Sequence, residues 1–275
     1  MNRRLFSVMG GALLLAVCTP KDDSTARAAA ADRTPVEDAQ GGATISGKIK
    51  FTGTKPTNPR IDMSEEATCK AKYPTAPTAE TAVVNANGTL ANVFVYVKAG
   101  LPAGGTYPVP ATPVVLDQNG CRYHPHVLGI MVGQNLEILN SDPVLHNIKA
   151  KAVKNRPFNV SQPSAGMKTM RTFAAPEVMV SLECNVHGWM NAFLGVLPHP
   201  FFAVSGADGS FSIKGLPPGT YTIEAWHEKY GTQTQSVTVG PNETKDVTFT
   251  FSAKAANAVP LGKPVIVHSA GHTSL

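Results

Sequence analysis

Short segments of alternating apolar and polar residues run through most of this chain. Residues 44–51 place Ile45, Ile49 and Phe51 on one face and polar side chains on the other, which predicts a half-buried β-strand. Residues 93–97 are apolar on both faces, a pattern typical of a strand inside a sheet. Both patterns favour a fold made of strands that are covered by a core on at least one side.

Similar segments follow as far as residue 251 and predict two further groups of strands. They are residues 114–116, 127–132, 136–139, 178–184 and 193–197, and then 202–205, 210–213, 220–226, 235–239 and 247–251. No stretch sustains the 3.6-residue stripe of a long helix, and only residues 64–72 suit one short helix. Residues 100–113 are rich in proline and glycine and predict an irregular crossing. The expected fold class is therefore all-β and sandwich-like.

The composition supports this interpretation and excludes several function classes. A chain of 275 residues suits one or two domains, and only 16% of the residues are charged, which excludes a solvated coil. The 24 glycines and 22 prolines suit many short strands joined by turns. The formal net charge is +5 without any basic run, so we expect no nucleic-acid partner.

The N-terminus predicts export from a bacterial cytoplasm. Arg3 and Arg4 precede an apolar run over residues 5–17, which is too short to span a bilayer and has the length of a signal-peptide core. We expect residues 1–30 to be the signal peptide of a periplasmic or secreted protein, with Sec and twin-arginine export both open. Cys18 is a candidate lipid-anchor site, which would make the chain a cell-envelope lipoprotein.

The remaining parts of the chain show neither periodicity nor membrane character. Residues 31–42 read as a linker and residues 253–275 as a disordered tail, because large apolar residues are scarce in both. No segment after the signal approaches the eighteen apolar residues that a membrane span needs. We therefore expect no membrane span in the mature protein.

Four residues with metal-ligating side chains form the strongest chemical signal. Cys184, His187 and Met190 lie within seven residues, and His146 supplies a second imidazole upstream. Two histidines, one cysteine and a weak axial methionine are the ligand set of a blue-copper site that transfers electrons. Zinc more often takes a tetrahedral set with more cysteine or carboxylate and no methionine. The alternative interpretation, without a metal ion, is a buried cysteine, a core methionine and two histidines that are unrelated to each other.

The spacing of these residues suggests how the chain would bring them together. Cys184 follows Val178, Val180 and Leu182 in the same strand phase, so its sulfur is expected to point into the sandwich with them. The loop after Cys184 can turn over one end of the sandwich and return His187 and Met190 to the same ion. His146 has to arrive from another strand.

These motifs resemble those of the cupredoxins, the group of plastocyanin, azurin and amicyanin. The Cys-x-x-His-x-x-Met loop is similar to the short loop of amicyanin, and His146-Asn147 is similar to the group's His-Asn pair, whose second residue helps to fix the sulfur. The resemblance covers residues 111–198 and implies a Greek-key sandwich with one copper ion. Residues 150–177 depart from the family's middle strands.

A second resemblance covers the C-terminal part of the chain. The strand–turn–strand around Asp208-Gly209 and the later Leu-Pro-Pro-Gly-Thr-Tyr segment resemble the carboxypeptidase regulatory-like, transthyretin-like β-sandwich. That family's opening strands match residues 45–51 and 92–97. We therefore expect residues 43–99 and 199–252 to form one discontinuous module that holds the copper domain as an insertion; a plain tandem is the alternative. The family is a non-catalytic scaffold.

The cysteine count predicts one disulfide. Outside the signal region Cys69, Cys121 and Cys184 remain, and an odd number in an exported chain is explained by one pair and one metal ligand. We expect Cys69 and Cys121 to pair, which would clamp the long loop after the first strand onto the copper domain and leave Cys184 free.

The remaining candidate residues have weaker signals. We expect His124 and His126 to be structural or surface residues, and a second ion there would need another donor such as His199. Trp189 suits either packing or contact with a partner protein. No sequence motif typical of a catalytic site stands out, so we expect that the protein is not an enzyme.

Three functions remain open at this level. The first is a copper protein that carries single electrons to a redox partner protein. The second is a copper-binding or trafficking protein without electron transfer. The third is a cell-envelope module that binds glycan or protein.

Overall fold

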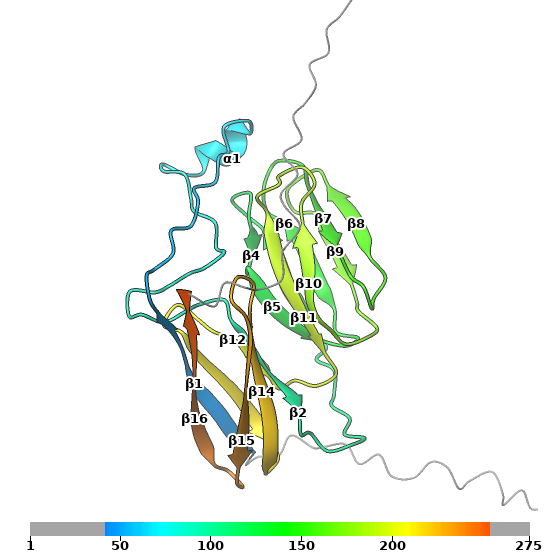
Figure 1. Ribbon diagram of the computed structural model, residues 1–275. Helices are drawn as coiled ribbons and strands as arrows, with labels where there is room; N and C mark the ends of the chain where they lie inside the picture. The colour runs from blue at the N-terminus through cyan, green and yellow to red at the C-terminus, as the bar shows by residue number, and fades with distance from the viewer. Residues whose placement is uncertain (1–41, 254–275) are drawn as a thin grey trace, which may run out of the picture. The chain divides into compact units, whose positions relative to one another are not determined.

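The computed structural model describes residues 42–253 of the chain, which contain sixteen strands and one short helix (Figure 1). The all-β fold class is confirmed, and every segment predicted as a strand overlaps one. The predicted signal peptide, residues 31–41 of the predicted linker and residues 254–275 of the predicted tail lie outside the described residues. Within residues 42–253, no helix has both the length and the apolar character to cross a membrane.

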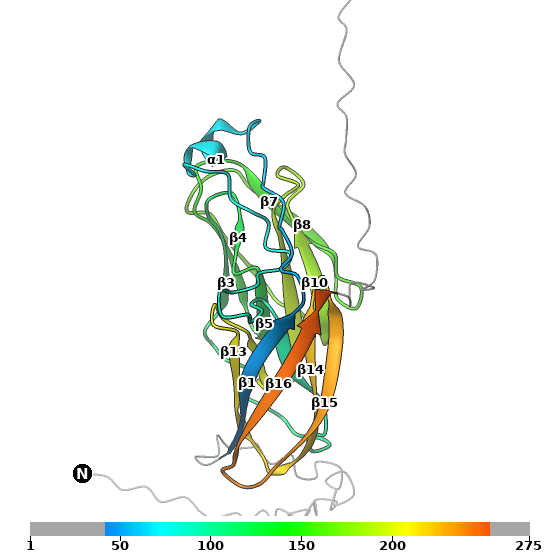
Figure 2. The same cartoon turned by 60° about the vertical axis from the view of Figure 1, so that its left-hand side comes forward.

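One sandwich joins strands from both ends of the described chain (Figure 2). Its sheets have the orders β13-β1-β16 and β12-β2-β14-β15. β1 runs parallel to β16, from Thr44 opposite Thr244 to Thr52 opposite Ser252. The strands are β1 (Ala43–Thr52), β2 (Phe94–Ala99), β12 (Phe202–Val204), β13 (Ser210–Leu216), β14 (Gly219–His227), β15 (Gly231–Val239) and β16 (Thr244–Ser252).

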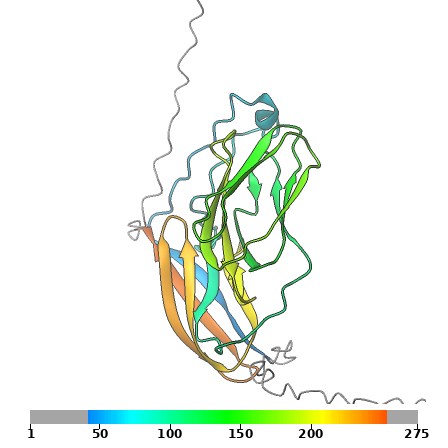
Figure 3. The same cartoon turned by 90° about the vertical axis from the view of Figure 1, so that its right-hand side faces the viewer.

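Buried apolar residues alternate with more exposed ones along β1, and the buried side chains form one core between the two sheets. Ile45 and Ile49 of β1 are fully buried and share a cluster with Val95 of β2 and Ile223 of β14. Figure 3 shows β1 in blue beside β16 in orange, as the register requires. The two ends of the described chain thus depend on each other, because β1 has partners only in strands more than 150 residues away among the described strands.

A second sandwich is formed by the middle of the chain. Its sheets have the orders β5-β11-β10-β7-β8 and β4-β3-β6-β9. Leu116 and Ile138 from one sheet pack with Ile148, Leu182 and Leu194 from the other. The strands are β3 (Val114–Gln118), β4 (Tyr123–His124), β5 (Val127–Met131), β6 (Leu136–Asn140), β7 (His146–Ala150), β8 (Phe158–Gln162), β9 (Lys168–Arg171), β10 (Glu177–Glu183) and β11 (Asn191–Leu197).

The long segment between β1 and β2, residues 53–93, reaches both sandwiches, and we call it the strap. Ala82, Val84 and Leu90 near its end belong to the core of the first sandwich. It contains the helix α1 (Ala67–Ala71) inside the segment that the sequence predicted as helical. Ile61 and Met63 of the strap join the core of the second sandwich. The predicted disulfide between Cys69 and Cys121 is present and ties α1 to the loop after β3.

The start of β10 corrects one prediction. Val178 was expected to point inward with Val180 and Leu182, but its side chain is 38% exposed, whereas theirs are 1% and 0% exposed. The pairing of β10 with β11 shifts register between Glu177 and Val180, so the strict two-residue alternation does not extend back to Val178. Glu177 takes the buried position instead, where its carboxylate accepts hydrogen bonds from the backbone of residues 153–155.

Candidate metal centre

Three potential ligands come together at one end of the second sandwich. His146 is the first residue of β7, Cys184 directly follows β10, and His187 lies in the loop that leads to β11. Their ligand atoms all lie within 4.8 Å of one another, and the three residues are 0%, 3% and 3% exposed. The two Nδ1 atoms are 2.9 Å apart, and the Cys184 sulfur is 4.0 Å from His187 Nδ1.

The tight loop from residue 184 to residue 190 places two of these side chains. The His187 N–H donates to the Cys184 sulfur at 3.3 Å, and the Met190 N–H donates to the His187 carbonyl at 2.9 Å. The Cys184 N–H donates in turn to the Met190 carbonyl at 3.2 Å. Met190 is 1% exposed and belongs to the same core cluster as Cys184. The loop therefore closes on itself beside β10.

Asn147 connects β7 to this loop. Its Oδ1 atom accepts the N–H groups of Asn185 at 2.7 Å and Val186 at 3.3 Å, and it lies 3.3 Å from the Cys184 sulfur. Its Nδ2 atom donates to Asn159 of β8 at 2.6 Å. One amide side chain thus holds the ligand loop to the strand that carries His146.

The surroundings of Cys184 favour its thiolate form. Burial alone would raise the pKa of this thiol, but the neighbouring His146 and His187 side chains and backbone N–H groups outweigh burial and lower the pKa to about 5. A thiolate is the form of cysteine that ligates metal ions. The surroundings of the sulfur therefore favour the form that binds metal ions.

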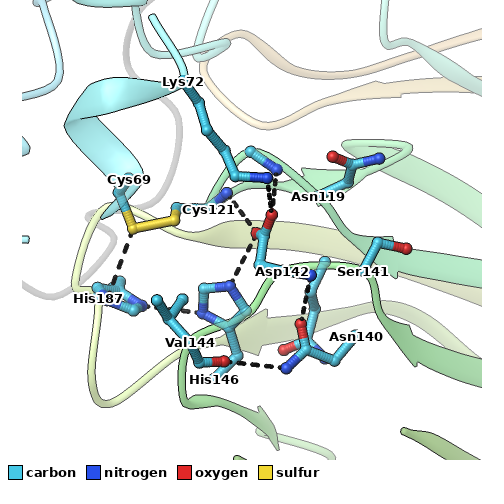
Figure 4. Close-up of polar contacts among 12 residues, drawn as sticks. Cys69, Lys72, Asn119, Cys121, Asn140, Ser141, Asp142, Val144, His146 and His187 are labelled. Atoms are coloured by element: carbon cyan, nitrogen blue, oxygen red, sulfur yellow. Dashed lines mark hydrogen bonds and ion pairs between the residues drawn. A yellow bond between two sulfur atoms is a disulfide. The ribbon is translucent and has the colours of Figure 1, made fainter. Parts of the chain in front are cut away.

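A buried carboxylate lies behind His146, and the sequence analysis did not identify it. Asp142 Oδ2 is 2.9 Å from His146 Nε2, and the carboxylate also accepts from Lys72, Gly120 N–H and Cys121 N–H (Figure 4). Burial opposes ionisation of Asp142, but these donors together hold its pKa well below the usual range. The sequence signal was the Asp142-Pro143 turn four residues before His146.

The strap covers the other histidine. Cys69 Sγ lies 4.0 Å from His187 Nε2, and the Trp189 indole N–H donates to the Cys121 carbonyl at 2.9 Å. The Trp189 ring packs on the His187 ring with centroids 5.0 Å apart. These contacts give Trp189 a packing role and leave the His187 edge covered by the disulfide.

The other histidines noted in the sequence do not join this cluster. His124 is exposed on β4. His126 is buried and contacts Glu228 at 2.6 Å, so no second ion site forms from His124, His126 and His199 among the described residues. His199 Nε2 donates to the Val97 carbonyl at 3.0 Å, and its Nδ1 accepts from Phe201 N–H at 3.3 Å.

The donor set can hold a transition-metal ion. It combines one soft sulfur with two imidazole nitrogens, all buried, and hard oxygen donors are absent from this group of three. Sulfur and imidazole ligands suit copper and zinc and do not suit magnesium or calcium. The residues present therefore fit a soft or borderline metal ion.

One known protein family matches the C-terminal part of the described chain. Residues 198–252 match the carboxypeptidase regulatory-like domain family, as the sequence resemblance implied. A comparison with curated proteins gave no match.

Three of the solved structures that are similar to part of this chain are described below. A Cu-containing nitrite reductase from Thermus scotoductus SA-01 is 23% identical with a TM-score of 0.30, over 36% of this chain and 25% of that chain. A purple cupredoxin from Nitrosopumilus maritimus is 22% identical with a TM-score of 0.27, over 30% of this chain and 98% of its own. An oxidised amicyanin variant is 17% identical with a TM-score of 0.29, over 37% and 97%. This chain therefore matches only a quarter of the length of the nitrite reductase.

Proposed function

We propose that this protein binds one copper ion in a type 1, or blue, site and carries single electrons outside the cytoplasm. The ligands are His146, Cys184, His187 and, as the weak axial ligand, Met190. The observation that carries the proposal is the convergence of two Nδ1 atoms and one thiol sulfur in a buried cluster drawn from β7 and from the loop that follows β10.

The geometry of the two imidazoles supports a bound cation. Two nitrogen lone pairs 2.9 Å apart repel each other unless a proton or a metal ion lies between them. His146 Nε2 faces a carboxylate, which can only accept, so the proton of neutral His146 belongs on Nε2 and leaves Nδ1 free to ligate. The two Nδ1 atoms and the Cys184 thiolate then face the same position.

Electron carriage requires a site that changes little between oxidation states. Copper supplies the exchange between Cu(I) and Cu(II) when bound. Asn147 and the backbone of the 184–190 loop hold the sulfur and His187 in place through hydrogen bonds. This support limits rearrangement of the ligands. A redox partner protein donates the electron and another accepts it, and the chain itself performs no catalysis.

A copper-holding protein without electron transfer is the second candidate. The burial of His187 beneath the Cys69–Cys121 disulfide favours it, because a covered ligand retains a metal ion well. Reversible oxidation and reduction in protein-film voltammetry distinguishes the two: an electron carrier gives a reversible wave at modest scan rates, and a holding protein does not.

The module that contains residues 198–252 serves as a non-catalytic scaffold in this proposal. The predicted signal peptide supports a periplasmic or cell-envelope location for the mature protein, and the disulfide suits such an oxidising compartment.

Addition of Cu(II) to the purified protein without residues 1–30 tests the proposal. We expect an intense thiolate-to-copper charge-transfer band that Cys184→Ser abolishes and that His124→Gln, a control at an exposed histidine, leaves unchanged. Met190→Leu should keep the band and shift the potential, because the axial bond is weak. A band that survives Cys184→Ser would overturn the assignment.

A further inference from the structure

Asp142 is fully buried, yet its contacts give it no free position to bind a metal ion. Each carboxylate oxygen accepts two hydrogen bonds. Oδ1 accepts from Lys72 Nζ at 2.6 Å and Gly120 N–H at 2.9 Å, and Oδ2 accepts from Cys121 N–H at 2.7 Å and His146 Nε2 at 2.9 Å. The carboxylate is therefore oriented from four sides, and it faces the side of His146 remote from His187 (Figure 4).

Local structure fixes Asp142 before any metal binds. The Asp142 N–H donates to Asn140 Oδ1 at 2.9 Å, and Asn140 Nδ2 donates to the Val144 and Gln162 carbonyls at 3.0 and 2.9 Å. Asn140 itself is fully buried at the end of β6. The turn between β6 and β7 thus presents the carboxylate at a set distance from His146.

The strap reaches this carboxylate at two points. Lys72 directly follows α1 of the strap, and Cys121, whose N–H donates to Asp142, is bonded to Cys69 of α1. The Lys72 side chain is 32% exposed, whereas Asp142 is 0% exposed. A charge on the strap therefore neutralises a buried charge that contacts a proposed ligand.

We propose that Asp142 is a positioning residue for His146 and that Lys72 of the strap sets how strongly Asp142 acts. This inference rests on the proposed copper site. The Asp142 carboxylate holds the proton of His146 on Nε2 and makes the imidazole a stronger donor, which favours Cu(II) over Cu(I). The Lys72 ammonium draws charge from the carboxylate and opposes that effect. The strap thereby tunes the reduction potential of the copper site.

Opposite charge changes at the two residues provide the test. Asp142→Asn keeps an accepting oxygen but removes the charge, and it should weaken Cu(II) binding relative to Cu(I) by about tenfold, which corresponds to a potential about 59 mV higher for one electron. Lys72→Met should lower the potential. Lys70→Met removes the same charge from an exposed position of α1 and should leave the potential unchanged.

A second measurement reports the tautomer directly and does not require electron transfer. In the Zn(II)-loaded protein, nitrogen-15 NMR should show the His146 proton on Nε2, with slow exchange in the wild type and faster exchange in Asp142→Ala. A proton on His146 Nδ1 would overturn the inference.

The outcomes separate this inference from the proposed function. If the wild type forms a blue site but Asp142→Asn and Lys72→Met shift the potential in the same direction, or not at all, the inference fails and the copper site stands. If the wild type forms no blue site, the proposed function fails, and the Zn(II) measurement still decides the role of Asp142. Lys72→Met also covers the case in which Asp142 variants do not fold.

Discussion

His146 and His126 are both buried and lie within hydrogen-bond distance of a carboxylate, but of these two only His146 also faces other ligating atoms. His146 Nε2 is 2.9 Å from Asp142, and its Nδ1 is 2.9 Å from His187 Nδ1. His126 Nε2 is 2.6 Å from Glu228, and its Nδ1 is 3.2 Å from the Asn191 carbonyl. The partner of Nδ1 therefore distinguishes the two residues: Nδ1 of His146 faces a possible ligand, whereas Nδ1 of His126 faces a backbone carbonyl.

The chemistry of His126 follows from its two acceptors. The groups that face the two ring nitrogens of His126, a carboxylate and a carbonyl, can only accept hydrogen bonds. Protonated His126 can therefore donate one hydrogen bond to each of them. Burial alone would lower the pKa of His126, but the Glu228 carboxylate outweighs it and raises the pKa. His126 thus links the start of β5 to the turn after β14 through both ring nitrogens, and it has no nitrogen left for a metal ion.

Substitution of the two histidines should give the largest contrast in copper binding. His146→Gln removes a ligand, so we expect loss of the blue band and at least a hundredfold weaker Cu(II) binding in a chelator competition. His126→Gln should retain both. Equal copper affinities for the two variants would contradict the distinction between these histidines.

Loss of the disulfide should give the largest change in stability. Cys69 and Cys121 are 52 residues apart, and the loop-entropy relation for that separation gives about 4 kcal/mol in the free energy of unfolding. The double variant Cys69→Ser with Cys121→Ser, unfolded with denaturant and compared with the wild type, measures this. A loss below about 1 kcal/mol would mean that the strap is held by packing alone.

Removal of one partner from the His126–Glu228 pair should destabilise the fold without affecting the metal centre. Both side chains are about 95% buried, and leaving one member of a buried hydrogen-bonded pair without its partner costs about 3 kcal/mol. We expect Glu228→Gln to lower the free energy of unfolding by that amount at neutral pH. The visible spectrum of the copper-loaded variant is the control, and a changed spectrum would show that the two pairs are coupled.

Two histidines give the stability opposite pH dependences. Burial lowers the pKa of His227 to about 3, so below pH 6.5 the unfolded chain binds the extra proton and stability falls by up to about 1.4 kcal/mol per pH unit until about pH 3. The raised pKa of His126 has the reverse effect, because its contribution is lost as the pH rises through that pKa. His227→Gln should flatten the acid side of the profile, whereas an unchanged acid slope would contradict the assignment.

The smallest contrast concerns the irregular start of β10. Val178→Thr should change the free energy of unfolding by less than about 0.5 kcal/mol, since Val178 is exposed. Val180→Thr places a hydroxyl in the core and should cost about 2 kcal/mol. If thermal or denaturant unfolding shows equal losses of stability for the two variants, then Val178 points inward, as the alternation predicted.

Sequence patterns identified most strands because burial and alternation are local. The strands that they missed have weak local signals. β4 has only two residues, β7 begins with the polar pair His146-Asn147, and no residue of β9 is fully buried. β8 also alternates only between half-buried and exposed residues over its first four positions. Val178 was misplaced because a register shift is decided by the partner strand, which the periodicity of one strand does not record.

The sequence predicted those parts of the candidate site whose residues lie close together in the chain or have distinctive chemistry. The Cys-x-x-His-x-x-Met spacing pointed to Cys184 and His187, and the odd cysteine count pointed to the Cys69–Cys121 pair. The contact between Lys72 and Asp142 joins residues 70 apart, and the contact between His126 and Glu228 joins residues 102 apart. Such contacts depend on the packing of the whole chain and have no local pattern.

X-ray absorption of the Cu(II)-loaded protein tests the central claim most directly, because it counts the atoms bound to copper. The account predicts one short copper–sulfur bond and two imidazole nitrogens, with the sulfur contribution lost in Cys184→Ser. Copper bound only by nitrogen and oxygen in the wild type would contradict the account.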